Sequence, residues 1–246
     1  MGRLHVYDTG INVESSAAGE ANLRNKFFDI LSQYVEGIVK VDDGDNHYIR
    51  DGLFDNPALG LIPRHYYYNS RYYLTVHGNN TSSEYGCVRI NGSSSSNKIL
   101  IYHTPINGGC IFSPVGTGES YFENFIYALF RRKIDNHLIL IYSGAAINTF
   151  NIASGFVLAD LSTNENPIVE YSNPKLPHDE AKIDTECISL APFVYNGFDY
   201  GDSNSIFLAI TYPVLARNQI QSFTLKGKEY VNLRTVGGLP FTIELP

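Results

Sequence analysis

Acidic side chains gather at one place in the chain where they could carry out catalysis. His178, Asp179 and Glu180 are followed at short spacing by Asp184 and Glu186. Two carboxylates that flank one bond are what glycoside hydrolysis needs. Neighbours in sequence rarely converge on one substrate atom, however, and a run of charges usually forms a solvated face. A glycoside hydrolase is therefore kept only as an alternative to a solvated loop.

A second acidic run could bind a metal ion. Residues 42–46 read Asp-Asp-Gly-Asp-Asn and offer several oxygen ligands of the kind that Ca²⁺ prefers. The glycine does not stand where an EF-hand loop requires it, and no Glu closes the loop. Asp, Asn and Gly together also form tight turns. The sequence favours a turn over a calcium site, both here and at Asp199–Asp202.

The remaining catalytic templates fail on spacing. The segment Gly116–Ser120 lacks the third glycine of a dinucleotide loop and the Lys-Ser or Lys-Thr pair of a phosphate loop. No G-x-S-x-G elbow is present. The cysteines, Cys87, Cys110 and Cys187, form no CxxC pair, and their odd number leaves at least one outside any disulfide. We therefore predict no catalytic residue, no cofactor-binding residue and no metal ligand, and a protein that is not an enzyme.

The tyrosines favour a contact surface instead. Residues 65–73 contain Tyr66, Tyr67, Tyr68, Tyr72 and Tyr73. The stretch from Tyr66 to Val76 is expected to be a strand, in which consecutive residues lie on opposite faces. Tyrosine is favoured at protein interfaces because it combines a large rigid ring with a hydrogen-bonding tip, and the same rings could stack on a sugar. The competing interpretation is core packing of one face with ordinary exposure of the other.

A basic cluster adds two residues to the predicted interface. Arg131 and Arg132, followed by Lys133, form the one dense basic cluster of the chain. The two arginines could meet an acidic patch on a neighbouring copy, and we predict them as interface residues together with the five tyrosines. Protection of a strand edge against pairing with another chain is the alternative role.

Composition restricts the class of partner. Charged residues make up 17% of the 246 residues, against about 25% in a typical soluble chain. The formal net charge is -7, the wrong sign for a protein that neutralises phosphates, so nucleic acid is excluded as a main partner. The sequence contains no run of about 18 apolar residues, the length needed to span a membrane. No apolar run follows Arg3 as in a secretory signal. We expect a soluble intracellular product with no membrane partner.

One helix is predicted near the start of the chain. Ser15 and Ser16 can cap it, and apolar residues recur at three- and four-residue steps as far as Ile38. The pattern predicts an amphipathic helix of about five turns that ends near Gly37 and docks on a sheet of its own chain or on another subunit. The chain then divides into residues 1–40, an N-terminal arm and helix, and residues 41–246, a β-rich body that could form one continuous domain with them.

Short strands are predicted after Gly37. Apolar runs rich in β-branched and aromatic residues alternate with turn residues, which predicts a mainly antiparallel β-sandwich or barrel-like fold. Hairpins are expected to join residues 85–90 to 98–103, 121–132 to 137–142, and 219–225 to 230–236. Residues 121–133 also fit a helical spacing, but their composition favours a strand. Pro63 indicates an edge or a loop.

Composition and one hairpin carry a resemblance to a known class of proteins. The body is rich in Ser, Asn and Tyr, has no Trp, and has Met1 as its one methionine. The stretch Phe223–Leu233 resembles the short hairpins of tail, neck and capsid-accessory proteins, and the chain as a whole resembles structural proteins of tailed bacteriophage particles. The resemblance implies a virion component, assembled in the host cytoplasm, that forms homo-oligomers and binds other virion structural proteins in a symmetric assembly. The alternative is a carbohydrate- or receptor-binding β-sandwich module that uses the tyrosines.

Overall fold

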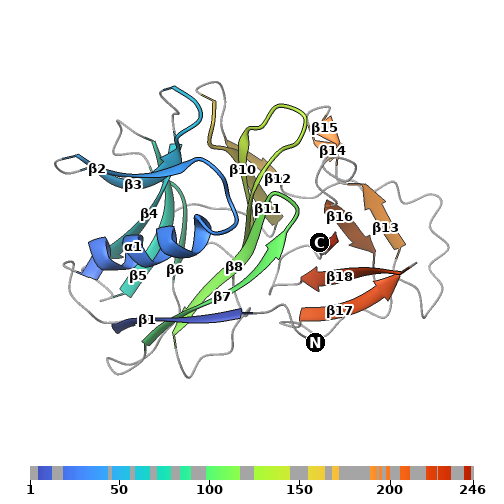
Figure 1. Ribbon diagram of the computed structural model, residues 1–246, viewed down its shortest axis with the longest axis horizontal. Helices are drawn as coiled ribbons and strands as arrows, with labels where there is room; N and C mark the ends of the chain where they lie inside the picture. Colours follow the sequence, from blue (N-terminus) through green and yellow to red (C-terminus); the bar gives the residue numbers. More distant parts are fainter. Residues whose placement is uncertain are drawn as a thin grey trace.

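The structure is a computed structural model of the chain. It describes residues 5–12, 19–43, 46–55, 59–66, 71–78, 84–89, 98–116, 125–144, 155–163, 168–171, 189–192, 194–195, 198–199, 206–210, 220–225, 227–233 and 241–244. These residues form mainly antiparallel β-structure with one α-helix, as the sequence predicted (Figure 1). Each sheet has two end strands that pair on one side, so within these ranges no sheet closes into a barrel.

The central sheet, sheet A, has seven strands in the order β1-β7-β8-β9-β10-β11-β12. All of its pairings are antiparallel. Its strands are β1 (His5–Asn12), β7 (Lys98–Ile106), β8 (Gly109–Gly116), β9 (Phe125–Arg131), β10 (Leu138–Gly144), β11 (Gly155–Asp160) and β12 (Ile168–Tyr171). The strand predicted within residues 121–132 is β9, which leads into the basic cluster. It lies inside the sheet, between β8 and β10.

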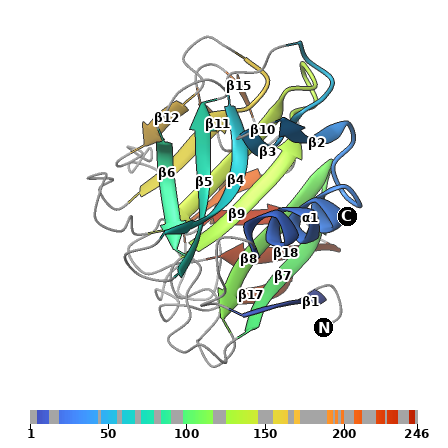
Figure 2. The ribbon, with the colours of Figure 1, turned by 90° about the vertical axis from the view of Figure 1, so that its left-hand side faces the viewer.

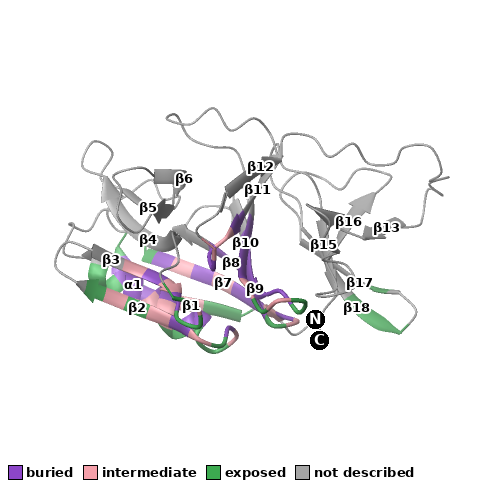
Figure 3. Ribbon diagram, turned by 90° about the horizontal axis from the view of Figure 1, so that it is seen from above, coloured by how far each residue is buried: buried purple, intermediate pink, exposed green. Residues whose placement is uncertain are grey.

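Helix α1 (Gly19–Leu31) packs on sheet A of its own chain, one of the two options that the sequence left open. Its residues Leu23 and Phe27 are buried in one hydrophobic cluster with strand residues such as Ile101 and Leu129. The rings of Phe27 and Phe112 meet edge to face with their centroids 6.0 Å apart. Figure 2 shows α1 crossing in front of β7, β8 and β9, and Figure 3 shows buried residues on both partners.

The helix ends at Leu31, and the prediction that it continues to Gly37 is wrong. Beyond Leu31 the chain forms tight turns, in which the N–H groups of Tyr34 and Val35 donate to the Leu31 carbonyl. Gly37 then takes a positive φ of 73°, which redirects the chain into the next strand. Val35 is nevertheless buried in the same cluster. The apolar periodicity therefore records contact with the core, and it continues past the end of the helix.

A second sheet, sheet B, has five strands in the order β2-β3-β4-β5-β6. They are β2 (Ile38–Asp43), β3 (Asn46–Asp51), β4 (Leu59–Tyr66), β5 (Arg71–Gly78) and β6 (Glu84–Arg89). The β2 and β3 strands pair with Asp43 opposite Asn46, so the chain reverses between the described ends of the acidic run, in agreement with the predicted turn. Helix α1 contacts β2, β3 and β4, which places it against both sheets.

Three predictions about this part of the chain are wrong. Residues 66–76 are not one strand, because β4 ends at Tyr66 and β5 begins at Arg71 directly opposite it. Residues 85–90 and 98–103 do not form a hairpin, because β6 pairs with β5 in sheet B while β7 pairs with β1 and β8 in sheet A. Pro63 lies within β4, opposite Leu74, and β4 lies between β3 and β5, so the prediction of an edge or a loop is wrong as well.

The other two predicted hairpins are confirmed. Strands β9 and β10 pair antiparallel with Leu138 opposite Arg131, and Asn136 in their turn has a positive φ of 62°. Strands β17 and β18 pair with Leu225 opposite Lys228. Their five-stranded sheet has the order β13-β16-β19-β18-β17, and β14 and β15 form a separate two-stranded ribbon. The bounds are β13 (Ser189–Pro192), β14 (Val194–Tyr195), β15 (Phe198–Asp199), β16 (Ile206–Ile210), β17 (Ile220–Leu225), β18 (Lys228–Leu233) and β19 (Phe241–Glu244).

The N-terminal elements share a core with the strands that follow. Ile11 of β1, Phe27 of α1 and Ile38 of β2 belong to one hydrophobic cluster with residues of sheet A. The predicted boundary at residue 40 passes through β2. Residues 5–12 of the predicted N-terminal arm form a paired strand, since β1 pairs with β7. Near the other end of the chain, β19 lies between β16 and β18.

Candidate functional site

Asp51 and Arg131 form a buried ion pair at the junction of the two sheets. Asp51 is the last residue of β3 and Arg131 the last residue of β9. Nη1 and Nη2 of Arg131 donate to Oδ2 and Oδ1 of Asp51 over 2.6 and 2.7 Å. Asp51 is 0% exposed and Arg131 7% exposed. Two parallel charge-assisted hydrogen bonds fix both the distance and the orientation of the pair.

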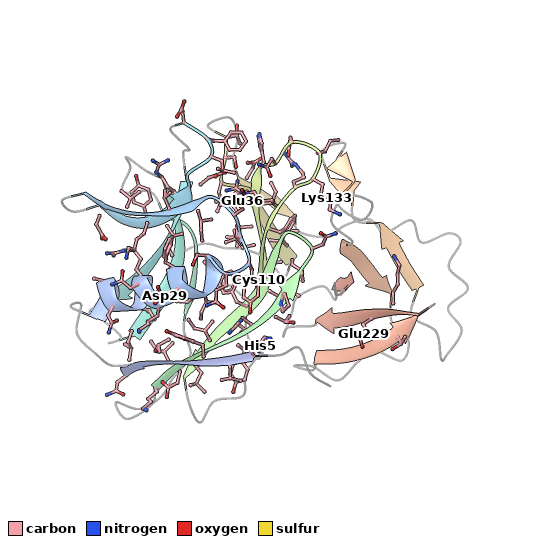
Figure 4. The ribbon with its side chains drawn as sticks, viewed as in Figure 1. His5, Asp29, Glu36, Cys110, Lys133 and Glu229 are labelled. Carbon is pink, nitrogen blue, oxygen red and sulfur yellow. The ribbon has the colours of Figure 1, made fainter. Side chains whose placement is uncertain are left out.

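The guanidinium of Arg131 also holds two backbone segments. Its Nε and Nη2 donate to the carbonyl of Glu36 over 3.0 and 2.8 Å. Nη1 donates to the carbonyl of Asn136 over 3.2 Å. One side chain therefore joins the turn that follows α1, the end of β3 and the β9–β10 turn. Figure 4 shows Glu36 and Lys133 in this region of the molecule.

The carboxylate of Asp51 has further donors. The N–H of Leu53 donates to Oδ1 over 2.9 Å, and the hydroxyl of Ser162 donates to Oδ2. Burial acts to raise the pKa of Asp51, but the hydrogen bonds from Arg131, Ser162 and Leu53 outweigh it, so the pKa lies below its ordinary value. The ionised form is thus the one that the fold stabilises.

A second cluster of charges lies beside the first. Arg132 is 4% exposed, and its Nε donates to both oxygens of Asp135 over 2.9 and 3.1 Å. Its Nη2 donates to Asp160 over 3.2 Å, and Nδ1 of His137 lies 2.8 Å from the same carboxylate oxygen. Burial acts to raise the pKa of Asp135, but hydrogen bonds from Arg132 and from the His137 N–H lower it overall. The cluster links the β9–β10 turn to Asp160 at the end of β11.

The two clusters tie strands together and show no arrangement for nucleophilic catalysis. Ser162 donates to Asp51 and accepts from the N–H of Leu138 over 2.6 Å, so its hydroxyl is engaged by groups other than the ring of His137. Cys110, labelled in Figure 4, is fully buried in the hydrophobic cluster that sheet A shares with α1. Burial raises the pKa of its thiol, which makes it unreactive. Among the residues that the structure describes, no group of three His, Cys, Asp or Glu side chains could hold a metal ion.

Arg131 and Arg132 lie inside the chain and not on its surface. Both guanidinium groups are engaged by carboxylates of the same chain. Protection of a strand edge is excluded as their role, because β9 pairs on both sides. Their role at an interface with another chain stays a prediction, and it would require these contacts to open. The sequence marked the two positions by charge but could not identify Asp51 or Asp160 as their partners.

The described tyrosines of the predicted interface lie on adjacent strands of sheet B. Tyr66 is in β4, and Tyr72 and Tyr73 are in β5. Tyr67 and Tyr68 fall between these strands, outside the described residues. The register places Tyr66 opposite Arg71, and Tyr73 between Arg64 of β4 and Arg89 of β6.

These pairings define one face of sheet B, which we name the Arg/Tyr face. Residues directly opposite each other in an antiparallel pair lie on the same face, and so do residues two apart along a strand. The Arg/Tyr face therefore carries Arg64, Tyr66, Arg71, Tyr73 and Arg89. Sequence reasoning found the tyrosines and missed the three arginines. The two-residue steps from Arg64 to Tyr66 and from Arg71 to Tyr73 were the available signal.

A histidine pair lies at the β1–β7 edge of sheet A. His5 of β1 is opposite His103 of β7, and their rings stack with centroids 5.4 Å apart. His103 is 7% exposed, and its Nδ1 lies 3.1 Å from the hydroxyl of Tyr34. Burial, and then the charge of His5, lower the pKa of His103 below its ordinary value. Burial raises the pKa of Tyr34 above its ordinary value. Both shifts favour the neutral forms.

The lowered pKa of His103 predicts a loss of stability in mild acid. The unfolded chain binds a proton at His103 more readily than the folded chain does, so the free energy of unfolding falls as the pH drops through about 6.5, the ordinary histidine value. The loss reaches its limit below the folded pKa. We expect the fall between about pH 7.5 and about pH 5.5 to be smaller in His103→Gln than in the natural protein. Urea unfolding at the two pH values measures it, and equal falls in the two proteins would contradict the prediction.

The acidic segments considered first are only partly described. Asp42 pairs with Arg24, whose side chain is 3% exposed. Asp199 ends β15, and the rest of the Asp199–Asp202 segment lies outside the described residues. The group from His178 to Glu186 lies wholly outside them. No described helix is both long enough and apolar enough to cross a membrane.

Comparison with known proteins gives no relative. No protein-family model, no curated protein and no solved structure matches the chain.

Proposed function

We propose that the protein is a non-enzymatic structural subunit of a virion of the tailed-bacteriophage type. In this proposal it associates with copies of itself and with neighbouring virion proteins in a symmetric assembly. We further propose that sheets A and B are the two layers of a β-sandwich, which is supported by the position of β4, β5 and β6 in front of sheet A in Figure 2. The resemblance in composition and in the Phe223–Leu233 hairpin is the basis for the class of particle.

The β1 edge of sheet A, which pairs with no described strand other than β7, is the observation that carries the proposal. Strand β1 is an end strand of this sheet and pairs with β7 on one side. An edge strand presents N–H and C=O groups that can pair with another chain. Val6, within the regularly paired part of β1, is 55% exposed, although it is a large apolar residue. A strand of this kind suits addition of a strand from a neighbouring subunit.

The buried ion pairs of the two charged clusters are consistent with an assembly protein. The buried carboxylates and guanidinium groups of the two clusters hold strand ends in place. These ion pairs therefore make the fold more rigid. A rigid fold loses less conformational entropy when another protein binds at its surface.

Light scattering across a concentration series tests the proposal. We expect the mass of the natural protein in solution to rise above that of the monomer as concentration increases. A strict monomer at every concentration would contradict self-association.

We expect Val6→Lys to weaken association about tenfold, or about 1.4 kcal/mol, because a charge on an edge strand opposes pairing. Ile134→Lys is the matched control, since Ile134 is also apolar and is 68% exposed, but lies in the β9–β10 turn.

A carbohydrate-binding module remains the second candidate, favoured by the aromatic residues of the β4–β5 hairpin. Tyr66 and Tyr73 lie on one face of it, and aromatic rings are platforms for sugars. Binding to a panel of oligosaccharides that is lost in Tyr66→Ala and Tyr73→Ala, together with a monomeric mass in solution, would favour this function over assembly.

A further inference from the structure

We infer that the Arg/Tyr face of sheet B is a contact surface that receives the acidic surface of a second copy of this chain. The inference rests on the proposed function and goes beyond it, because it names the surface and the chemistry of its partner. It is carried by strand register, by the position of the hydrophobic core and by the charge of the chain.

The register gathers the residues into two rows. One row runs across three strands as Arg64, Tyr73 and Arg89, and the other runs across two strands as Tyr66 and Arg71. Neighbouring strands lie about 4.8 Å apart, so the backbones of Arg64 and Arg89 are roughly 10 Å from each other with Tyr73 between them. The rows are about 7 Å apart along the strands. Three arginines and two tyrosines therefore belong to one small area of the sheet.

The core of the molecule lies on the other face of sheet B. Ile49 of β3 is buried in the hydrophobic cluster that includes α1, and it is opposite Leu61 of β4. Leu61 therefore marks the core face, and alternation along β4 places Arg64 and Tyr66 on the opposite face. The core face carries the apolar positions Leu61, Pro63, Leu74, Val76 and Val88, together with His65 and Tyr72 near the strand ends. Ile62 and Thr75 lie on the Arg/Tyr face, one row further along the strands from Arg64 and Tyr73.

Arginine and tyrosine are the residues expected at such a surface. Both are enriched at protein interfaces and among the residues that contribute most to binding energy. Arginine binds a carboxylate through two parallel hydrogen bonds, and the tyrosine ring supplies apolar contact area. The partner that suits this face therefore presents carboxylates on an otherwise polar surface.

A second copy of the chain has that character. Its formal net charge is -7, although the Arg/Tyr face contributes three positive charges. In the described residues, carboxylates are exposed on α1 at Asp29, in the turn after it at Glu36, and after β3 at Asp55. Figure 4 labels Asp29 and Glu36. Contact between the Arg/Tyr face of one copy and an acidic surface of the next joins two different surfaces, the type of contact that builds rings or filaments.

Charge reversal tests the inference. We expect Arg71→Glu/Arg89→Glu to weaken self-association at least tenfold in light scattering at low salt. The matched control is Lys133→Glu/Lys228→Glu, which changes the net charge equally at residues that are exposed on the β9–β10 turn and on β18. We expect this control to associate nearly as strongly as the natural protein. Association of the natural protein should also weaken as salt is added, because exposed charges are screened.

The outcomes separate the inference from the proposed function. Equal association of the two double variants would overturn the inference and leave self-association standing. A natural protein that is monomeric at every concentration would overturn both. A monomer that binds a sialylated or sulfated oligosaccharide, and loses that binding in Arg89→Gln, would assign the face to an anionic glycan and not to a second copy. Thermal unfolding checks that the variants fold, and Arg71→Gln/Arg89→Gln decides the result if the glutamate variant does not.

Discussion

Asp51→Ala is expected to lower the free energy of unfolding by about 3–5 kcal/mol, the cost of leaving a buried charge without its partner. Arg131 would keep its hydrogen bonds to the carbonyls of Glu36 and Asn136, but it would lose both carboxylate contacts at a position that is 7% exposed. Ser162 and the N–H of Leu53 would each lose an acceptor as well. The loss is large because one carboxylate accepts hydrogen bonds from three residues, two of which, Arg131 and Ser162, belong to distant segments of the chain.

Urea unfolding measures this loss, with Asp55→Ala as the control. Asp55 is an exposed carboxylate in the same connection, four residues further along, and a surface substitution there should change the free energy of unfolding by no more than about 0.5 kcal/mol. Equal losses in the two variants would show that Asp51 is not the buried partner that the structure describes. The double variant Asp51→Ala/Arg131→Ala should lose less than the sum of the two single losses, because the residues act as one unit.

The pH dependence offers an independent check on the same residue. The pKa of Asp51 is lowered in the folded state, so its contribution is present above the ordinary carboxyl value of 3.8. That contribution is lost as the pH falls from this value through the folded pKa. The natural protein should therefore lose stability over this acid range more steeply than Asp51→Ala does.

Local pattern predicted the elements better than it predicted their partners. The β9–β10 and β17–β18 hairpins were predictable, because each is made by two runs joined by a short turn. The predicted hairpin of residues 85–90 and 98–103 had the same local signals, yet its two strands belong to different sheets. A long polar connection permits either outcome, and the choice depends on which distant strand offers the better pairing.

The buried charges show the same limit at the level of single residues. Arg131 and Arg132 follow one another in a basic run, which on average indicates a solvated surface. Their burial depends on Asp51, which is 80 residues from Arg131 in the chain, and on Asp160, which is 28 residues from Arg132. The Arg/Tyr face likewise needed the register of three strands, although its two-residue spacing was visible in the sequence.

Gly109→Ala is expected to destabilise the fold by about 3 kcal/mol or more, at the upper end of the range for overpacked cores. Gly109 is buried at the start of β8, opposite Phe130 of β9. A Cβ atom there would lie 2.0 Å from the carbonyl oxygen of Leu129 and 2.6 Å from the Cα of Phe130. Both are backbone atoms, so no rotation of a side chain can relieve the contact. Strands β8 and β9 would have to separate, next to the hydrogen bond from the Arg131 N–H to the Gly108 carbonyl.

Gly227→Ala serves as the comparison, because it separates the cost of a close contact between strands from the cost of a strained backbone conformation. Gly227 has a positive φ of 78°, but nothing lies within 4 Å of a Cβ built on it. Its substitution should therefore cost about 1 kcal/mol, the strain of an L-residue in the left-handed region. Urea unfolding of both variants should show the larger loss in Gly109→Ala. The opposite order would mean that β8 and β9 tolerate a wider spacing than the structure shows. In that case the position of Arg131, at the end of β9, would depend less on close packing of the sheet than on its hydrogen bonds to Asp51 and Glu36.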